Sequence, residues 1–324
     1  MARKLVLVAL GGNAIKQADE KGTFEEQFNN IYKTCEELVK LIKAGYRLVI
    51  THGNGPQAGS LLIQQEAGAS EVPPMPLDAI GAMTQGQIGY MFAQALENIL
   101  WREKIPMPIV SVVNQVVVDP NDPDFKDPSK PVGPFYTKEE SEKLKAERKD
   151  WIIKQVKPEN VERRFRRVVA SPKPVRNVEY LAIRQMVEND MIVITSGGGG
   201  IPVISDKNAN LTGIAAVIDK DRAGEKLAES LGTDIFLILT DVENALINYG
   251  KENQQPVGKI TVSEMQKYVD EGHFLAGSMG PKVEAAIEFV KFSGCKSIIT
   301  SLDKAKDAIT GNVGTQIFPD HPDY

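Results

Sequence analysis

The chain opens with LVLVALGGN at residues 5–13, an apolar run that ends at two glycines and an asparagine. Six consecutive apolar residues before glycine indicate a β-strand that is buried on both faces. Helical spacing follows at 24–42, behind a capping box at Thr23–Glu26. A second apolar run, LVIT at 48–51, leads into HGNGP at 52–56. A strand, a helix and a strand in this order predict two parallel strands joined by a right-handed crossover.

The same alternation recurs along the rest of the chain. Strands are expected at 110–118, 191–196, 235–240 and 297–301, and helices at 177–189, at 220–231 and from Pro281 to Gly294. A further capping box is expected at Ser263–Gln266. Alternating strands and helices are typical of an α/β fold, and we expect a three-layer αβα sandwich with a mainly parallel central sheet.

Residues 119–175 depart from this alternation. They are rich in proline and charge, and they include the cluster Arg163–Arg167. A segment of this length outside the main sheet is typical of a functional lid or a small subdomain. We expect a protruding subdomain here, in which the arginine cluster forms a solvated or ion-paired face.

The helix expected at 79–101 contains three glycines, Gly81, Gly86 and Gly89. Each interior glycine costs roughly 1 kcal/mol relative to alanine. A helix that keeps three of them is expected to pack very closely against another helix or a partner subunit. The alternative is a helix that is broken at these positions.

The bulk composition excludes several classes of partner. The net charge is −5, so there is no basic surplus to neutralise the phosphates of a nucleic acid. The apolar run at 5–10 is too short to span a membrane and lacks a signal-peptide cleavage pattern. We therefore expect a cytoplasmic protein without a membrane partner. The two cysteines, Cys35 and Cys295, indicate neither a disulfide framework nor a cysteine-rich metal site.

Three glycine corners follow predicted strands, at 11–13, 53–55 and 197–200. Glycine lets a ligand touch the backbone, and bare N–H groups at a helix start attract anions. Lys220 and Lys282 lie beside such corners. Lys282 is expected in the first turn of a helix, where a lysine is unfavourable unless an anion binds there. The corners and lysines together predict a site for a small anion or a phosphate.

The motifs of the commoner nucleotide-binding folds are absent from the sequence. No P-loop motif is present, and no G-x-G-x-x-G follows the first strand. The three histidines have no metal-ligand spacing, and none is an evident general base. These features favour phosphoryl transfer to a small acceptor that is already ionised, with lysines and backbone donors stabilising the transferred charge.

Several segments resemble the motifs of the carbamate kinases, within the amino acid kinase family. The matching segments are VALGGNA at 8–14, THGNGPQ at 51–57, PLD at 76–78, TQG at 84–86, KPVGPFY at 130–136, GGGGIP at 197–202, DKD at 219–221 and GSMGPK at 277–282. The resemblance covers nearly the whole chain in order. It implies the amino acid kinase fold, with eight strands in a largely parallel sheet. It also implies the reversible reaction carbamoyl phosphate + ADP ⇌ carbamate + ATP, with Mg²⁺ held mainly through the nucleotide phosphates.

The resemblance implies a role for each lobe and for particular residues. Lobe 1–205 would bind carbamate or carbamoyl phosphate and form a homodimer, and lobe 206–324 would bind ATP or ADP. The implied catalytic residues are Lys130, Lys220, Lys282 and Asp219, with Asp219 orienting the lysines. The implied acceptor-site residues, which would supply backbone donors, are Gly11, Gly12, Asn13, Gly53, Asn54 and Gly55. The implied nucleotide-binding residues are Gly198, Gly199, Asp241, Val242, Tyr249, Ser278 and Met279. No residue is expected to bind a metal ion directly.

Two alternative functions stay open at this point. Another kinase of the same family would act on acetylglutamate or UMP, but these larger acceptors need side-chain anchors, and the acceptor corners offer almost only glycine and asparagine. A non-catalytic nucleotide-binding sensor is the second alternative. Loss of Lys220 or Lys282 would favour it, and both lysines are present.

Overall fold

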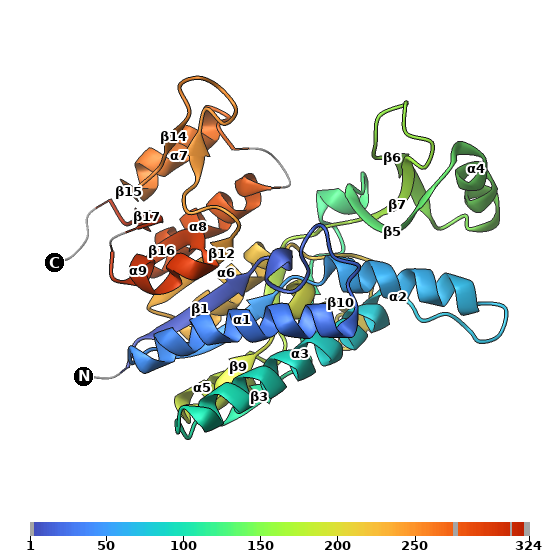
Figure 1. Ribbon diagram of the computed structural model, residues 1–324. Coiled ribbons are helices and arrows are strands. Elements are labelled where there is room, and N and C mark those ends of the chain that lie inside the picture. Colours follow the sequence, from blue (N-terminus) through green and yellow to red (C-terminus); the bar gives the residue numbers. More distant parts are fainter. Residues whose placement is uncertain (1–2, 275–277, 312, 321–324) are drawn as a thin grey trace.

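The computed structural model describes residues 3–274, 278–311 and 313–320 (Figure 1). Its central sheet has eight strands in the order β15-β17-β16-β12-β1-β2-β9-β3. The bounds are β1 Leu5–Leu10, β2 Arg47–His52, β3 Ile109–Ser111, β9 Ile192–Ile194, β12 Ile235–Thr240, β15 Lys259–Thr261, β16 Lys296–Ser301 and β17 Thr315–Phe318. All neighbours pair in parallel except β16 and β17. The predicted α/β class with a mainly parallel sheet is confirmed.

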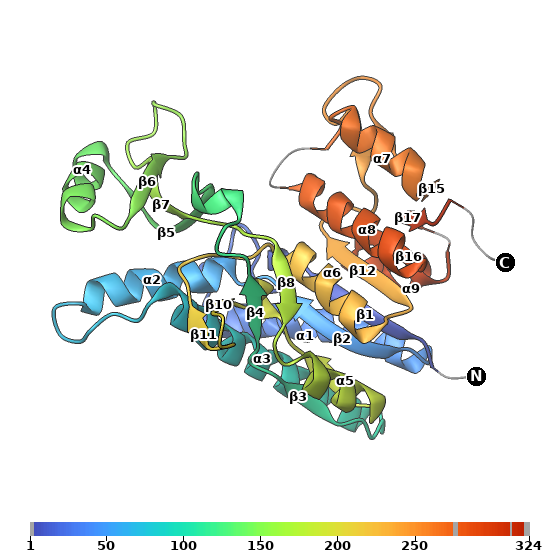
Figure 2. The ribbon, with the colours of Figure 1, turned by 180° about the vertical axis from the view of Figure 1, so that it is seen from behind.

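Helices cover both faces of this sheet (Figures 1 and 2). The bounds are α1 Phe24–Lys43, α2 Gly55–Gly68, α3 Leu77–Arg102, α4 Lys138–Glu147, α5 Tyr180–Glu188, α6 Lys220–Leu231, α7 Val262–Asp270, α8 Met279–Ser293 and α9 Ala305–Ile309. Short 3-10 turns are η1 Gly12–Ala14, η2 Pro123–Phe125, η3 Gly197–Gly199 and η4 Leu302–Lys304. Helices α1, α3 and α9 pack on one face, and α5, α6, α7 and α8 on the other.

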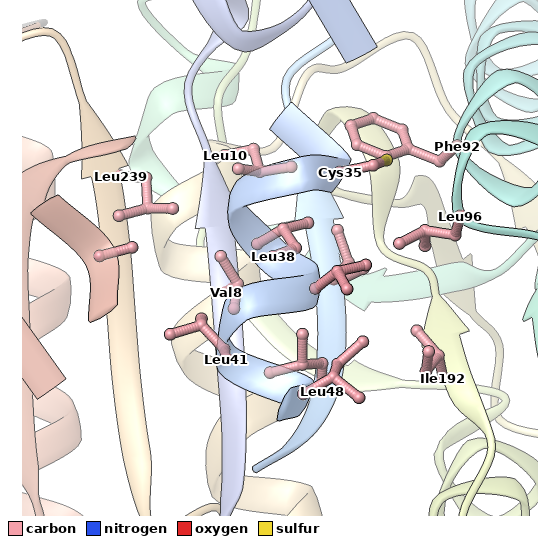
Figure 3. Close-up of a cluster of buried hydrophobic side chains, with 14 of the residues drawn as sticks. Val8, Leu10, Cys35, Leu38, Leu41, Leu48, Phe92, Leu96, Ile192 and Leu239 are labelled. Carbon is pink, nitrogen blue, oxygen red and sulfur yellow. The ribbon is translucent and has the colours of Figure 1, made fainter. Parts of the chain in front are cut away.

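Strand β1 explains why the first apolar run is continuous. Val8 and Leu10 point into the core under α1 and α3, which Figure 3 shows in close-up. Leu7 and Ala9 point into the opposite core. Because successive side chains of a strand alternate between faces, a strand with helices on both sides must be apolar at every position.

The predicted helix signals are right at one end of the chain and wrong by two residues at the other. Thr23 and Glu26 form the expected capping box before α1. The box expected at Ser263–Gln266 is instead formed by Thr261 and Glu264. Ser263 lies inside α7, and its backbone N–H and hydroxyl both donate to Asp320. Ser263, which local spacing predicts as the cap residue, therefore hydrogen-bonds to the distant carboxylate of Asp320 and does not cap the helix.

The single strand expected at 110–118 is also wrong, because it is two strands in different sheets. β3 ends the central sheet, whereas β4 (Gln115–Val118) belongs to a four-stranded sheet with β8 (Pro174–Asn177), β10 (Ile201–Ser205) and β11 (Leu211–Gly213). Buried Asn114 separates them. Its backbone N–H donates to the Gln85 side chain at 2.8 Å, and its Oδ1 accepts from the Ser196 N–H at 2.7 Å. These contacts redirect the chain between the two sheets.

Within the segment 119–175, three antiparallel strands form a small sheet in the order β5-β7-β6. The strands are β5 Lys130–Tyr136, β6 Ile152–Gln155 and β7 Phe165–Val169, and α4 packs on them. Both ribbon views show these elements standing away from the central sheet (Figures 1 and 2). A two-stranded ribbon, β13 (Leu246–Ile247) with β14 (Gln255–Pro256), lies near the other end of the chain.

Helix α3 is continuous across its three glycines, so the broken-helix alternative is excluded. A Cβ atom on Gly89 would lie 1.9 Å from the Ser111 hydroxyl, so the close packing is real, but its partner is strand β3. Gly86 has open space around its Cα, and Gly81 has only an ordinary contact with Ile201. No helix within the described ranges is long and apolar enough to cross a membrane.

We predict that Gly89→Ala destabilises the protein by about 1–3 kcal/mol, because the added methyl group overlaps Ser111. The matched control is Gly81→Ala in the same helix. Its methyl group would lie 3.8 Å from Ile201, so it should be neutral or stabilise by up to about 1 kcal/mol. Urea unfolding of both variants measures the difference. Equal midpoints for the two variants would contradict the packing argument.

Candidate functional site

The glycine corners predicted to bind an anion meet at one edge of the central sheet. Strands β1, β2 and β12 are parallel, so their carboxyl ends lie together. A Cβ atom on Gly53 would lie 3.5 Å from the Gly12 nitrogen and 3.5 Å from Cδ of Lys220. The Asn13 side chain donates a hydrogen bond to Asp241, just beyond β12. Residues from four distant parts of the sequence therefore line one small region.

Two of the six predicted backbone donors are already used by the fold. The Gly11 N–H donates to the Leu239 carbonyl and the Gly53 N–H to the Leu10 carbonyl, both at 3.1 Å. These bonds extend the sheet beyond the strands, so neither amide is free for a ligand. The amides of Gly12, Asn13, Asn54 and Gly55 make no hydrogen bond within the part of the chain that the structure describes. They are the donors that an anion could reach.

Two lysines from different helices are held together by one buried carboxylate. Asp221 is 2% exposed, and its two oxygens accept from Lys220 Nζ at 2.5 Å and from Lys282 Nζ at 3.2 Å. Burial opposes its ionisation, but the two ammonium groups outweigh burial and keep the pKa of Asp221 below its ordinary value. The lysines themselves are partly exposed, so each keeps donors for a ligand.

The predicted role of Asp219 as the residue that orients these lysines needs correction. Asp219 caps α6, where its Oδ1 accepts from the N–H groups of Asp221 and Arg222. Its other oxygen lies 3.5 Å from Lys130 Nζ. The Asp221 side chain is buried against the two lysines, whereas Asp219 is held at the helix end. The two carboxylates therefore serve different lysines.

The tetraglycine turn joins the second corner to the start of α6. A Cβ atom on Gly198 would lie 2.2 Å from the Asn54 side chain, and one on Gly199 would lie 2.3 Å from the Ile218 carbonyl. Both glycines also have positive φ angles. Only residues without a Cβ allow the corner and the helix to approach this closely.

A cavity opens beside this turn, between α2, β5 and the tetraglycine segment. Within the part of the chain that the structure describes, no side chain caps the N-terminus of α2, and Asn54 and Gly55 at this helix end line the cavity. Polar and glycine residues of the cavity wall are Asn54, Gly55, Gly59, Gly81, Lys130, Gly133, Arg166, Gly198 and Gly200. The cavity thus brings together Lys130, the free donors of the second corner and the predicted residue Gly198.

The remaining predicted nucleotide residues lie in three places. Asp241 and Val242 directly follow β12, and Tyr249 lies beyond β13 with an exposed side chain. Ser278 and Met279 are the N-cap and the first residue of α8, and no side chain among the described residues caps this helix. The preceding Gly277 lies outside the described residues. Helix α8 begins at Met279, two residues before the predicted start at Pro281.

His52 is buried beneath the corner that it precedes. Its ring stacks on Phe92 with centroids 5.8 Å apart, and a Cβ on Gly197 would overlap it. Burial lowers the pKa of His52 to about 4; a hydrogen bond with the Gly53 carbonyl opposes this, and the charge of Lys220 adds to it. The imidazole is therefore neutral near pH 7 and packs as part of the core.

Sequence reasoning missed several residues that build the site. Asn114 and Gln85 shape the tetraglycine turn, since the Gln85 amide donates to the Gly197 carbonyl at 3.1 Å. Thr84 accepts a hydrogen bond from the Asn54 side chain at 2.9 Å. Thr84 and Gln85 lie on α3 within the matched motif TQG at 84–86, which gave no role to either residue, and no sequence signal marks Asn114 between β3 and β4. Asp221, by contrast, stands next to Lys220 in the motif DKD at 219–221, so its place beside that lysine could have been read from the sequence.

The family model described as "Amino acid kinase family" matches residues 4–301. The chain belongs to the amino acid kinase family. A carbamate kinase of Thermococcus kodakarensis is 52% identical over 317 residues, which cover 97% of this chain and 99% of that protein. A carbamate kinase of Trichomonas vaginalis is 48% identical over 316 residues, with 97% and 99% covered. The family predicted from the motifs is confirmed.

Solved structures agree with this amino acid kinase assignment. A carbamate kinase from Giardia lamblia bound to AMP-PNP superposes with a TM-score of 0.94 at 46% identity, covering 98% of this chain and 99% of that one. An N-acetylglutamate synthase from Neisseria gonorrhoeae gives a TM-score of 0.58 at 12% identity, covering 99% of this chain and 61% of that one. The second likeness shows a shared fold alone.

The buried His52 predicts a pH dependence of stability in this amino acid kinase. Its pKa is about 4 when folded and about 6.5 when unfolded, so between these values the unfolded chain binds more protons. Stability should therefore fall as pH drops from about 6.5 towards 4, by up to about 3 kcal/mol from this group. Urea unfolding of the unaltered protein and of His52→Gln at several pH values isolates the effect. Parallel pH profiles would contradict it.

Proposed function

We infer that this protein catalyses the carbamate kinase reaction, the reversible transfer of a phosphoryl group between ATP and carbamate. Carbamate kinases that align over nearly its full length support this reaction. The inference rests on one observation in this chain. Asp221 holds Lys220 and Lys282 together beside the glycine corners. Two cations fixed next to free backbone donors suit a migrating phosphoryl group.

The acceptor site fits a small anion that is already ionised. Its donors are the amides of Gly12, Asn13, Asn54 and Gly55, with few side chains that could anchor a larger acceptor. The nearby His52 is buried and neutral, so it is unsuited to act as a general base. Carbamate carries its negative charge before the reaction and needs no base. The acetylglutamate and UMP alternatives gain no support from this arrangement.

We propose that ATP or ADP binds with Mg²⁺ in the lobe 206–324, along the N-termini of α6 and α8. The uncapped start of α8 offers N–H groups to phosphates, at Ser278 and Met279. No group of three or more His, Cys, Asp or Glu residues within the described ranges could hold a metal ion. A donor set of lysines and amides fits Mg²⁺ that arrives on the nucleotide phosphates, where the ion would neutralise phosphate charge.

We propose a homodimer that forms through α1 and α3 in the lobe 1–205, and a cytoplasmic location. Large apolar side chains are exposed on these helices: Phe24, Met83, Tyr90 and Trp101. The rings of Phe24 and Tyr90 stack across the two helices with centroids 6.4 Å apart. Large exposed apolar side chains on two neighbouring helices are typical of a protein interface.

The reaction is tested by incubating the protein with carbamoyl phosphate and Mg·ADP. We expect ATP to form, because the site offers its donors to a small anionic acceptor and to phosphates. Luciferase detection measures the ATP. Parallel reactions with acetylglutamate and ATP, and with UMP and ATP, serve as comparisons. Turnover of either alternative without turnover of carbamoyl phosphate would overturn the proposal.

Replacement of Lys282 tests the lysine pair. Lys282→Ala should lower kcat at least about a hundredfold, because a preorganised charge at the transferred group is lost. Lys291→Ala is the matched control, since Lys291 lies on the same helix α8 but pairs with Glu288 at the surface. Circular dichroism checks the fold of both. A Lys282→Ala enzyme that turns over as fast as the control would remove Lys282 from the mechanism.

A further inference from the structure

The arginines of the cluster Arg163–Arg167 do not share one environment. Arg163 pairs with Glu140 at 3.0 Å, and Arg167 lies over the ring of Trp151. Arg166 forms no ion pair with a carboxylate anywhere in residues 3–274, 278–311 and 313–320. The expectation of a solvated or ion-paired face therefore holds for Arg163 and fails for Arg166.

Arg166 is fixed next to the strand that carries Lys130. Its Nε and Nη2 atoms donate to the Gly133 carbonyl at 3.0 and 2.6 Å, and its guanidinium lies 4.7 Å from the centroid of the Phe135 ring. Gly133 sits where the pairing of β5 with β7 shifts register, three residues after Lys130. Two hydrogen bonds and a ring contact thus hold the guanidinium against the β5 bulge.

The Arg166 guanidinium is half-buried, and no carboxylate among the described residues pairs with it. Burial lowers the pKa of Arg166, whereas Tyr136 acts in the opposite direction. A cation that leaves water without a counter-ion is destabilising, and an anion that binds beside it reverses the cost. The bonds to Gly133 use two of its five N–H groups, and the others are available in the planar arrangement that matches carboxylate or phosphate oxygens.

Arg166 also lines the cavity that Lys130, Asn54 and Gly55 line. Asn54 and Gly55 supply free N–H groups there, and the remaining wall is largely apolar, with Leu62, Leu77, Val132 and Val217. Apolar walls lower the local dielectric, which strengthens the attraction between an anion and nearby donors.

We propose that Arg166 is a substrate-binding residue that holds the anionic acceptor-side substrate, carbamate or carbamoyl phosphate, together with Lys130. The proposal rests on the function inferred above and adds a residue to its acceptor site. Lys130 pairs with Asp219, so its charge is shared with the C-terminal part of the chain. Among the described residues the charge of Arg166 has no such carboxylate partner, so it is free to attract the ligand.

Substitution of Arg166 separates its charge from its contact with Gly133. Arg166→Gln can still donate a hydrogen bond to the Gly133 carbonyl but carries no charge. Arg166→Lys keeps the charge but loses the fork. The matched control is Arg163→Gln, because Arg163 also donates to a β5 carbonyl, that of Phe135, at 2.9 Å, but does not line the cavity. All variants are assayed as the full chain, with circular dichroism as the check of folding.

We expect Arg166→Gln to raise the KM for carbamoyl phosphate about tenfold or more, with the KM for ADP unchanged. Arg166→Lys should fall between Arg166→Gln and the unaltered protein, and Arg163→Gln should behave like the unaltered protein. Arg166→Gln with unchanged KM values, or with equal rises for both substrates, would overturn the proposal.

Calorimetric titration with inorganic phosphate tests the same site without turnover. Phosphate should bind about tenfold more weakly to Arg166→Gln than to Arg163→Gln. This arm separates the two proposals: absence of carbamoyl phosphate turnover with the expected difference in phosphate binding would overturn the reaction but keep the anion site. Equal phosphate binding by the two variants would overturn the role of Arg166.

Discussion

The buried carboxylate of Asp221 is the constraint on which the site depends. It holds Lys220 at the start of α6 and Lys282 in the first turns of α8, so two helices that are about sixty residues apart in the chain present their cations together. Without this negative charge the two ammonium groups would repel each other, and an ammonium at a helix N-terminus also opposes the helix dipole. A phosphate bound between the two lysines would add negative charge, which reduces their mutual repulsion and interacts favourably with the helix N-termini. Anion binding would therefore stabilise the arrangement of the two helices.

Glycine performs a different task at each corner of the site. In the tetraglycine turn it permits contact, because Asn54 and the Ile218 carbonyl occupy the space where Cβ atoms would lie. At the first two corners, some amides complete the sheet and others stay free, as Gly11 and Gly12 illustrate. A glycine motif therefore indicates close approach of the backbone, and the hydrogen bonds decide whether the approaching group is another part of the fold or a ligand.

The protein carries a net charge of −5, yet its candidate site is basic. The cations are concentrated by geometry: Lys220 and Lys282 around Asp221, Lys130 against Asp219, and Arg166 at the wall of the cavity. A small anion is attracted by this local field, whereas an extended polyanion would meet an acidic surface. The local positive charge therefore favours ligands that are both negatively charged and small.

The fold class, most strand and helix positions and the family could be predicted from the amino-acid sequence, because apolar periodicity and glycine motifs are local signals; the roles of Lys220 and Lys282 stay predictions. Only the tertiary structure divided 110–118 between two sheets, moved the cap of α7 to Thr261 and assigned the lysine pair to Asp221. Each of these outcomes depends on a partner far away in the chain, such as Gln85 for Asn114 or Asp320 for Ser263. Spacing along a sequence carries no information about such partners, since hydrogen bonds and burial are decided by proximity in space.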